Sequence, residues 1–205
     1  MNMLNKKLLL AVLIFAVSFF RLFPNEDGKK SALLIIDVQE FYFPDGRMPL
    51  ENPKAVAANI SLVLEAFREQ GMPVIHVRHN FEPGGDIHQM VAPRDGELVI
   101  SKESPNSFLN TSLKEYLDKN EIDELIVCGM QTHMCVEGTV RAASDQGYDC
   151  IVLSDACATR PVVYGDHTVG WEEVHYSTLA TLHNVYGIVV ETGYFLDEMM
   201  HKSSE

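Results

Sequence analysis

Six short runs of apolar residues alternate with segments of helical periodicity, and this alternation constrains the fold more than any other feature of the chain. The runs are continuous rather than alternating in polarity, which is typical of parallel strands covered on both faces. They occupy residues 32–37, 74–77, 98–101, 124–128, 150–154 and 188–191.

Helical segments fill most of the gaps between these runs, at residues 53–70, 112–120, 134–146 and 172–183. Strands that alternate with helices form right-handed βαβ units. The pattern therefore predicts an α/β fold, a three-layer α/β/α sandwich of Rossmann-like type. Its central sheet is expected to be mostly parallel, with about six strands.

The composition limits the domain count and the classes of partner. Of the 205 residues, 46% are apolar, and no repeat or low-complexity linker divides the chain. We therefore predict a single domain over residues 30–205. The formal net charge is −13. A chain this acidic repels nucleic acid and anionic lipid, so we expect neither as a partner.

The first 29 residues differ from the rest and are excluded from the predicted fold. Lys6 and Lys7 precede an apolar stretch at 8–20 in which Ser18 is the one polar residue. At about 1.5 Å per residue, this stretch is too short for a hydrocarbon core of about 30 Å. The order predicts a signal peptide cut after Ser18, hence a secreted or periplasmic protein with no membrane contact after processing. A membrane-anchored or cytoplasmic protein is the alternative.

Three polar residues stand at or just beyond predicted strand ends. Asp37 closes the first run, Lys102 follows the third, and Cys135 lies where a helix begins after the fourth. Ligands of open parallel sheets bind beyond the carboxyl ends of the strands, so we expect all three at one rim. A thiol nucleophile, a carboxylate base and an ammonium predict acyl transfer through a thioester. Lys102 and the helix N-terminus are expected to lower the pKa of the Cys135 thiol.

The other three cysteines are expected to be structural. Cys128 and Cys150 fall in predicted strands and Cys157 just beyond one, where buried thiols behave as small hydrophobes. None of the cysteines forms a CxxC pair, so a structural zinc site is not expected.

A rival motif overlaps the predicted helix at residues 134–146. Cys135 and Arg141 have the spacing of Cys-dependent phosphatases. That chemistry needs a loop of N–H groups around phosphate. Glu137 would repel phosphate, and the apolar residues nearby follow one helical face. We therefore do not expect a phosphatase.

Four motifs resemble the isochorismatase-like cysteine hydrolases, a group that includes nicotinamidases and N-carbamoylsarcosine amidohydrolases. The resemblance covers about residues 31–197 and rests on IIDVQEFYF (35–43), VISKESPNSF (99–108), VCGMQTHMCVEGTVRAA (127–143) and VLSDACAT (152–159). It implies that Asp37, Lys102 and Cys135 form a catalytic triad. It also implies a cis peptide bond between Met130 and Gln131, with the N–H groups of Gln131 and Cys135 as the oxyanion hole.

Departures from the family pattern narrow the expected chemistry. Isochorismatases usually lack the nucleophilic cysteine, so Cys135 favours hydrolysis of a C–N bond in a small amide or ureide. Isochorismatase-type ether hydrolysis and a catalytically silent binding or assembly protein are the alternatives. The metal site of nicotinamidases directly follows the second strand, whereas Asp86 and His88 come later in the loop after His79. We therefore expect no metal and no cofactor, although the histidines of residues 76–88 leave metal binding open.

Four further residues are candidates for contact with a small-molecule substrate. Phe43 is expected in the pocket wall, and Gln39 either orients Asp37 or binds the substrate. His133 lies in the turn before the nucleophile, and Trp171 precedes the last predicted helix. Because many proteins of the resembled family form oligomers, we also expect a homo-oligomer.

Overall fold

The computed structural model describes residues 29–202. The signal peptide and short leader were predicted over residues 1–29, and all but the last of these residues lie outside the described part of the chain. Within the part of the chain that is described, no helix is both long enough and apolar enough to cross a membrane.

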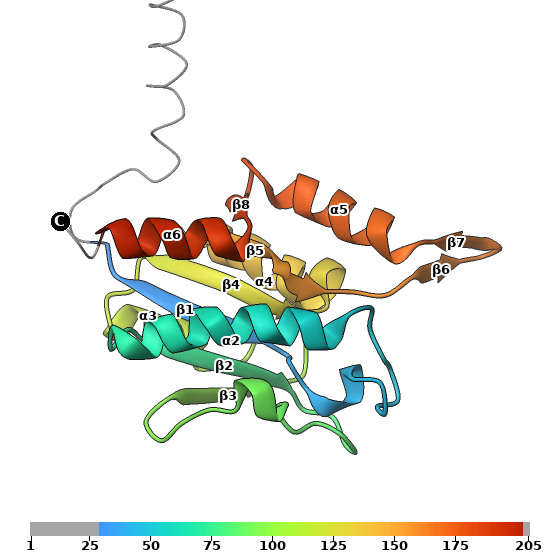
Figure 1. Ribbon diagram of the computed structural model, residues 1–205, viewed down its shortest axis with the longest axis horizontal. Coiled ribbons are helices and arrows are strands. Elements are labelled where there is room, and N and C mark those ends of the chain that lie inside the picture. The colour runs from blue at the N-terminus through green and yellow to red at the C-terminus, as the bar shows by residue number, and fades with distance from the viewer. Residues whose placement is uncertain (1–28, 203–205) are drawn as a thin grey trace, which may run out of the picture.

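Six parallel strands form the central sheet (Figure 1). Their order across the sheet is β3-β2-β1-β4-β5-β8, and each neighbouring pair is parallel. The strands are β1 (Ser31–Ile36), β2 (Val74–His79), β3 (Leu98–Lys102), β4 (Glu124–Met130), β5 (Asp149–Ala158) and β8 (Ile188–Val190). Each strand contains most of one predicted run, so the predicted α/β sandwich is confirmed.

Helices cover both faces of the sheet (Figure 1). One face carries α2 (Pro53–Glu69) and α6 (Thr192–Lys202), and the other carries α3 (Leu113–Lys119), α4 (Glu137–Asp145) and α5 (Trp171–Leu182). Side chains alternate between the faces of a strand, so β1 sends Leu33 and Ile35 to one core and Leu34 and Ile36 to the other. The apolar runs are continuous because each strand serves two cores.

The strand order reverses between β1 and β4. From β1 the chain continues outward to β2 and β3, and it returns on the other side of β1 as β4. Such a reversal opens a crevice at the carboxyl ends of the two central strands. Asp37 directly follows β1, and η3 (Thr132–Val136), one turn of π-helix, follows β4 after a single residue.

The end of β4 approaches β1 so closely that only glycine fits there. Gly129 is the register partner of Ile36 and has a φ of 132°, a conformation that residues with a side chain rarely adopt. A Cβ atom at this position would lie 2.0 Å from the Ile36 carbonyl oxygen. This approach sets the residues that follow Gly129 beside Asp37.

A hairpin and a helix in the described chain were not predicted. The strands β6 (Val162–Tyr164) and β7 (His167–Val169) form an antiparallel hairpin that extends from the body of the molecule (Figure 1). The side chain of Tyr164 in this hairpin is 87% exposed. Helix α6 also had no counterpart among the predicted segments. The homo-oligomer stays a prediction, since one chain is described.

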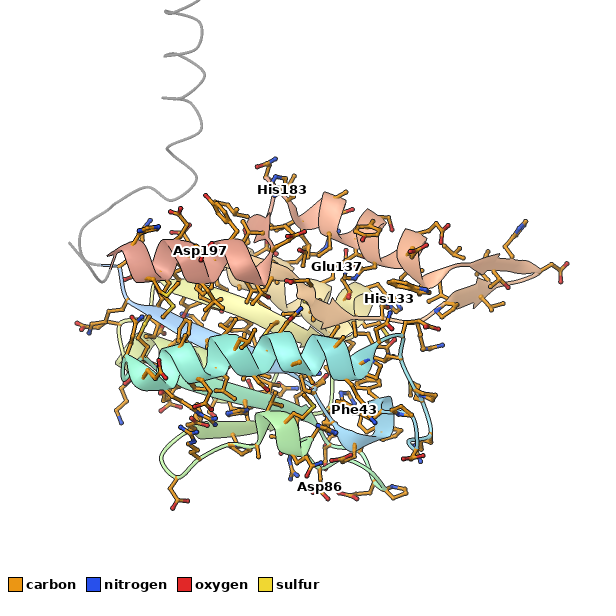
Figure 2. The ribbon with its side chains drawn as sticks, viewed as in Figure 1. Phe43, Asp86, His133, Glu137, His183 and Asp197 are labelled. Carbon is orange, nitrogen blue, oxygen red and sulfur yellow. The ribbon has the colours of Figure 1, made fainter. Side chains whose placement is uncertain are left out.

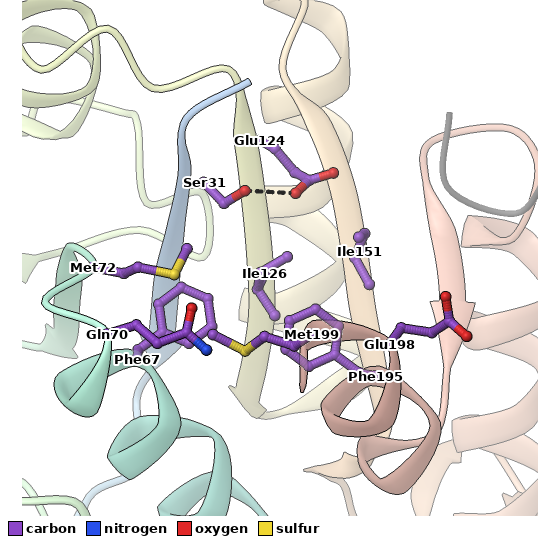
Figure 3. A pocket seen from close by; sticks show the side chains of 10 residues that line it. All are labelled: Ser31, Phe67, Gln70, Met72, Glu124, Ile126, Ile151, Phe195, Glu198 and Met199. Atoms are coloured by element: carbon purple, nitrogen blue, oxygen red, sulfur yellow. Dashed lines mark hydrogen bonds between the residues drawn. The ribbon is translucent and has the colours of Figure 1, made fainter. Parts of the chain in front are cut away.

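A cavity of about 290 Å³ lies between α2 and α6 at the amino-terminal end of the strands (Figure 3). Ser31 and Glu124, which begin β1 and β4, are joined there by a hydrogen bond of 2.7 Å. Phe67 and Phe195 contribute the apolar part of the wall. No residue at the carboxyl ends of the strands lines this cavity, so the candidate active site lies elsewhere.

Candidate active site

The three side chains that were expected at one rim do meet there. The Lys102 Nζ atom lies 2.8 Å from Asp37 Oδ2 and 3.2 Å from Cys135 Sγ. All three residues are buried. One ammonium group therefore bridges a carboxylate and a thiol that are shielded from solvent.

Local backbone geometry positions each member of this triad. Asp37 has a φ of 51°, a left-handed conformation that turns the chain out of β1. Lys102 ends β3, where its register partner in β2 is His79. Cys135 lies in the π-helical turn η3 and not in a regular helix from Met134 as predicted; the regular helix α4 begins at residue 137. Such π-turns are frequent at functional sites.

Lys102 has two further partners besides the carboxylate and the thiol. Its Nζ atom donates to the Ser104 carbonyl oxygen at 3.0 Å and lies 3.3 Å from His79 Nδ1. The ammonium group thus has four neighbours for its three N–H bonds. A buried ammonium that is surrounded by acceptors in this way is held at one place.

Burial controls the protonation of the Cys135 thiol and of the Asp37 carboxyl group. It raises the pKa of Asp37 above the usual value, and Lys102 opposes this rise. Burial and the charge of Asp37 raise the pKa of the Cys135 thiol to about 12, again with Lys102 opposing. The lowered thiol pKa that we predicted is therefore wrong for the resting site, because desolvation outweighs the attraction of the ammonium.

The turn before Cys135 contains the cis peptide bond that was predicted between Met130 and Gln131. The Gln131 carbonyl oxygen accepts hydrogen bonds from the N–H groups of Met134, at 3.0 Å, and Val136, at 3.3 Å. These two bonds close the turn η3 on Gln131, the residue that precedes it. The N–H groups of Gln131 and Cys135 belong to this closed turn, and their role as an oxyanion hole stays a prediction.

Comparison with known proteins gives the family. The family model for the isochorismatase domain matches residues 31–183. The chain belongs to the isochorismatase family. It is 45% identical to YddQ of Bacillus subtilis, an isochorismatase family protein, in an alignment that covers 81% of this chain and 98% of YddQ. A crystal structure described as an isochorismatase hydrolase from Oleispira antarctica superposes with a TM-score of 0.79, at 37% identity, over 83% of this chain and 97% of that chain.

Amide hydrolysis occurs among the more distant relatives of this isochorismatase-family chain. The chain is 26% identical to the maleamate amidohydrolase of Pseudomonas putida, in an alignment that covers 85% of this chain and 89% of that protein. The family match and such relatives show that the chain is a hydrolase.

In this isochorismatase-family hydrolase, the Gln39 side chain forms hydrogen bonds with the last residue of β2. Its Nε2 atom donates to the carbonyl oxygens of His79, at 2.9 Å, and Gly85, at 2.6 Å. Its Oε1 atom accepts the His79 N–H at 2.8 Å. Because every polar atom of the side chain is engaged, the geometry favours an orienting role over contact with substrate. The group that Gln39 holds is His79 and not Asp37.

The other three candidates for substrate contact lie on separate elements. Phe43 is buried and stacks on His88 with 3.6 Å between ring centroids, beside a groove of about 740 Å³. His133 Nδ1 lies 2.6 Å from Thr159 Oγ1, and burial lowers the pKa of the ring. Figure 2 shows Phe43 and His133 on the side toward which the strands point. Trp171 is half-buried as the first residue of α5.

The histidines and the aspartate of residues 76–88 do not form the metal site of nicotinamidases. The buried His76 pairs with Glu97 at 2.9 Å. His88 stacks on Phe43, and its Nδ1 atom accepts the N–H of Met90. Asp86 is exposed. His76 and His88 are committed to other contacts, and the exposed Asp86 does not join them, so these residues do not fit a shared ion.

A different group of ligand-type atoms does lie together among the described residues. One such atom each from Asp37, His79 and Cys135 falls within 4.8 Å of the others. The Lys102 ammonium lies within 3.3 Å of all three side chains. The protein's own cation thus takes the central position, and a metal ion would have to displace it against charge repulsion.

The residues of the phosphatase-like motif form a helix and not a phosphate-binding loop, as expected. Residues 137–145 form α4, and Arg141 binds the Glu137 carboxylate at 2.8 Å and the Tyr186 hydroxyl at 2.6 Å. Its guanidinium group is held on the side of the helix and does not return to Cys135.

Sequence reasoning missed Arg160, which follows β5 after one residue. Its charge acts on Tyr42 and His133, and the Tyr42 hydroxyl accepts a hydrogen bond from Gln131 Nε2 at 3.2 Å. The Arg160 Nε atom is buried and has no hydrogen-bond partner among the described residues. No motif marks this arginine; its one signal is its place beyond the carboxyl end of a strand.

Proposed function

We propose that this hydrolase cleaves the C–N bond of small amides through a thioester on Cys135. The observation that carries the proposal is the buried Lys102 ammonium, 2.8 Å from the Asp37 carboxylate and 3.2 Å from the Cys135 thiol. This arrangement supplies a nucleophile, a base and a counter-charge in one contact. Ether hydrolysis has no need of the thiol.

The proposed reaction has two halves. Asp37 takes the thiol proton, and Cys135 attacks the carbonyl carbon, while the N–H groups of Gln131 and Cys135 hold the oxyanion. The C–N bond breaks as Asp37 returns the proton to the leaving amine. A water molecule, deprotonated by Asp37, then attacks the thioester carbonyl, and the C–S bond breaks to release a carboxylic acid. Asp37 returns the proton to the departing Cys135 thiolate, which restores the resting site. Lys102 balances the negative charge in each step.

Arg160 supports a substrate that carries a carboxylate beside the amide. Its unpartnered, buried Nε atom lies at the Tyr42 and His133 side of the site. A guanidinium N–H that has no acceptor among the described residues matches a carboxylate of a ligand. Maleamate, the substrate in the name of one relative, has this combination of groups.

Ammonia release from paired substrates tests the proposal. We expect turnover of short amides with a free carboxylate, and slower turnover of the same amides as neutral esters. An Arg160→Met substitution is expected to raise KM for the carboxylate-bearing amides roughly 10- to 100-fold, the effect of losing a charged hydrogen bond, with less change for the neutral amides. Turnover of isochorismate and of none of the amides would refute amide hydrolysis.

The reactivity of Cys135 should depend on pH in an unusual way. Because Asp37 and Cys135 both have raised pKa values, the latter about 12, the pair holds one proton between them over the neutral range. The thiolate with protonated Asp37 is then a constant fraction of the molecules. We expect the rate of alkylation by iodoacetamide to be flat from about pH 6 to 9, and to fall in acid as both groups become protonated.

Free cysteine provides the reference for this measurement, because its alkylation rate follows an ordinary thiol with a pKa of about 8.5. Peptide mapping by mass spectrometry assigns the label to Cys135. A protein rate that rises tenfold per pH unit through pH 6–8 would show that Asp37 does not share the proton.

A further inference from the structure

We infer that His79 is a positioning residue that fixes the Lys102 ammonium between the carboxylate and the thiol. The inference rests on the proposed function only in taking Cys135 as the nucleophile. It assigns a role to a residue that neither the triad nor the family motifs include.

The contact between the two side chains follows from the sheet. His79 and Lys102 are register partners at the ends of the parallel strands β2 and β3, so their side chains leave the sheet on the same face as neighbours. The Lys102 Nζ atom lies 3.3 Å from His79 Nδ1. An ammonium group can only donate, so Nδ1 must accept, and the ring proton sits on Nε2.

The position of His79 is itself fixed by the protein. The Gln39 side chain holds both the N–H and the carbonyl of His79, at 2.8 and 2.9 Å. The next residue, Asn80, donates its N–H to the Lys102 carbonyl oxygen at 2.8 Å. The backbone that carries the imidazole is therefore tied to β3 and to the segment after Asp37 at the same time.

These contacts make a chain from the loop after β1 to the reacting atoms. Gln39 fixes His79, His79 orients the ammonium of Lys102, and Lys102 contacts Asp37 Oδ2 and Cys135 Sγ. A lysine side chain has four rotatable bonds, so an extra acceptor reduces the positions that its ammonium can take. The buried Gln39 side chain is therefore not available to bind substrate. Its role is to hold the backbone of His79 in place.

Two substitutions of similar size, His79→Asn and His79→Leu, distinguish the hydrogen bond to Lys102 from the volume of the side chain. Asparagine can place an acceptor oxygen near the position of Nδ1, whereas leucine has the same shape and no acceptor. We expect His79→Leu to lower both the alkylation rate of Cys135 at pH 7 and kcat about tenfold, the effect of losing one hydrogen bond to a charged group. We expect His79→Asn to stay within about threefold of the wild type, and KM to be unchanged in both variants.

Arg78→Gln serves as the control, because Arg78 lies on the same strand end and bonds Ser101 across to β3 without contacting the triad. Urea unfolding of all variants shows that each is folded at the assay concentration. Equal rates for the leucine variant and the wild type, or equal losses in the leucine and asparagine variants, would overturn the inference. The alkylation arm reports on the thiol even if no amide is a substrate, so a failure of the proposed function leaves the test of His79 intact.

Discussion

Replacing Cys135 with alanine is expected to lower the rate of amide hydrolysis on the order of 10⁴- to 10⁶-fold, because the variant cannot form the thioester. The fold should persist, since the substitution removes one buried sulfur atom. The Cys135 side chain packs in the core between the sheet and the helices α3, α4 and α5. The measurement is ammonia release together with urea unfolding of the same preparations.

Cys150→Ala is the matched control for this loss. Cys150 is also a buried thiol, but it lies near the amino-terminal end of β5 and its Sγ atom contacts the Val140 and Tyr148 carbonyl oxygens. Its alanine variant should keep the activity of the wild type. Residual activity of Cys135→Ala above about one per cent of the wild type would rule out covalent catalysis by this residue.

Replacing Lys102 with methionine is expected to lower the free energy of unfolding at pH 7 by about 3–5 kcal/mol. This is the usual effect of leaving one charge of a buried ion pair without its partner. Both side chains of the Lys102–Asp37 pair are 0% exposed. The variant leaves the Asp37 carboxylate without its counter-charge, so the pKa of Asp37 rises further. A group whose pKa is higher in the folded state loses stability as pH rises, so the deficit should be smaller at pH 4–5 than at pH 7.

The double variant Asp37→Asn, Lys102→Met should recover most of this free energy, since neither charge remains buried. Lys114→Met is the control, because the Lys114–Asp118 pair has the same 2.8 Å separation with side chains 49% and 56% exposed. Solvent screens that pair, and its loss should change stability little. Unfolding in urea at several pH values gives all the comparisons. A double variant no more stable than the single one would show that the ion pair is not the cause.

The sheet could be predicted from the sequence because a parallel strand between two helical layers must be apolar on both faces. The run at 32–37 illustrates this, since its alternate side chains enter different cores. The hairpin of β6 and β7 could not be predicted in the same way. Its residues bury little surface, so neither face requires apolar side chains and the pattern of a strand is absent.

The positions of Asp37, Lys102 and Cys135 could be predicted because strand ends of a parallel sheet share an edge. Their protonation could not, since it depends on how far each group is removed from water, and burial is a property of the whole fold. The contacts of Gln39 with His79 and the unpartnered Nε atom of Arg160 depend likewise on loop conformations that no periodicity records.

The four buried, unpaired cysteines determine how the protein responds to oxidants. Oxidants react with thiolates, and burial raises the pKa of Cys128 far above its usual range and those of Cys150 and Cys157 to about 12. In the folded protein these three thiols are thus protected from oxidation, and Cys135 is the one thiol with a proposed route to the thiolate. The unfolded chain has four ordinary thiols. The risk of wrong disulfides is therefore greatest before the sheet has formed.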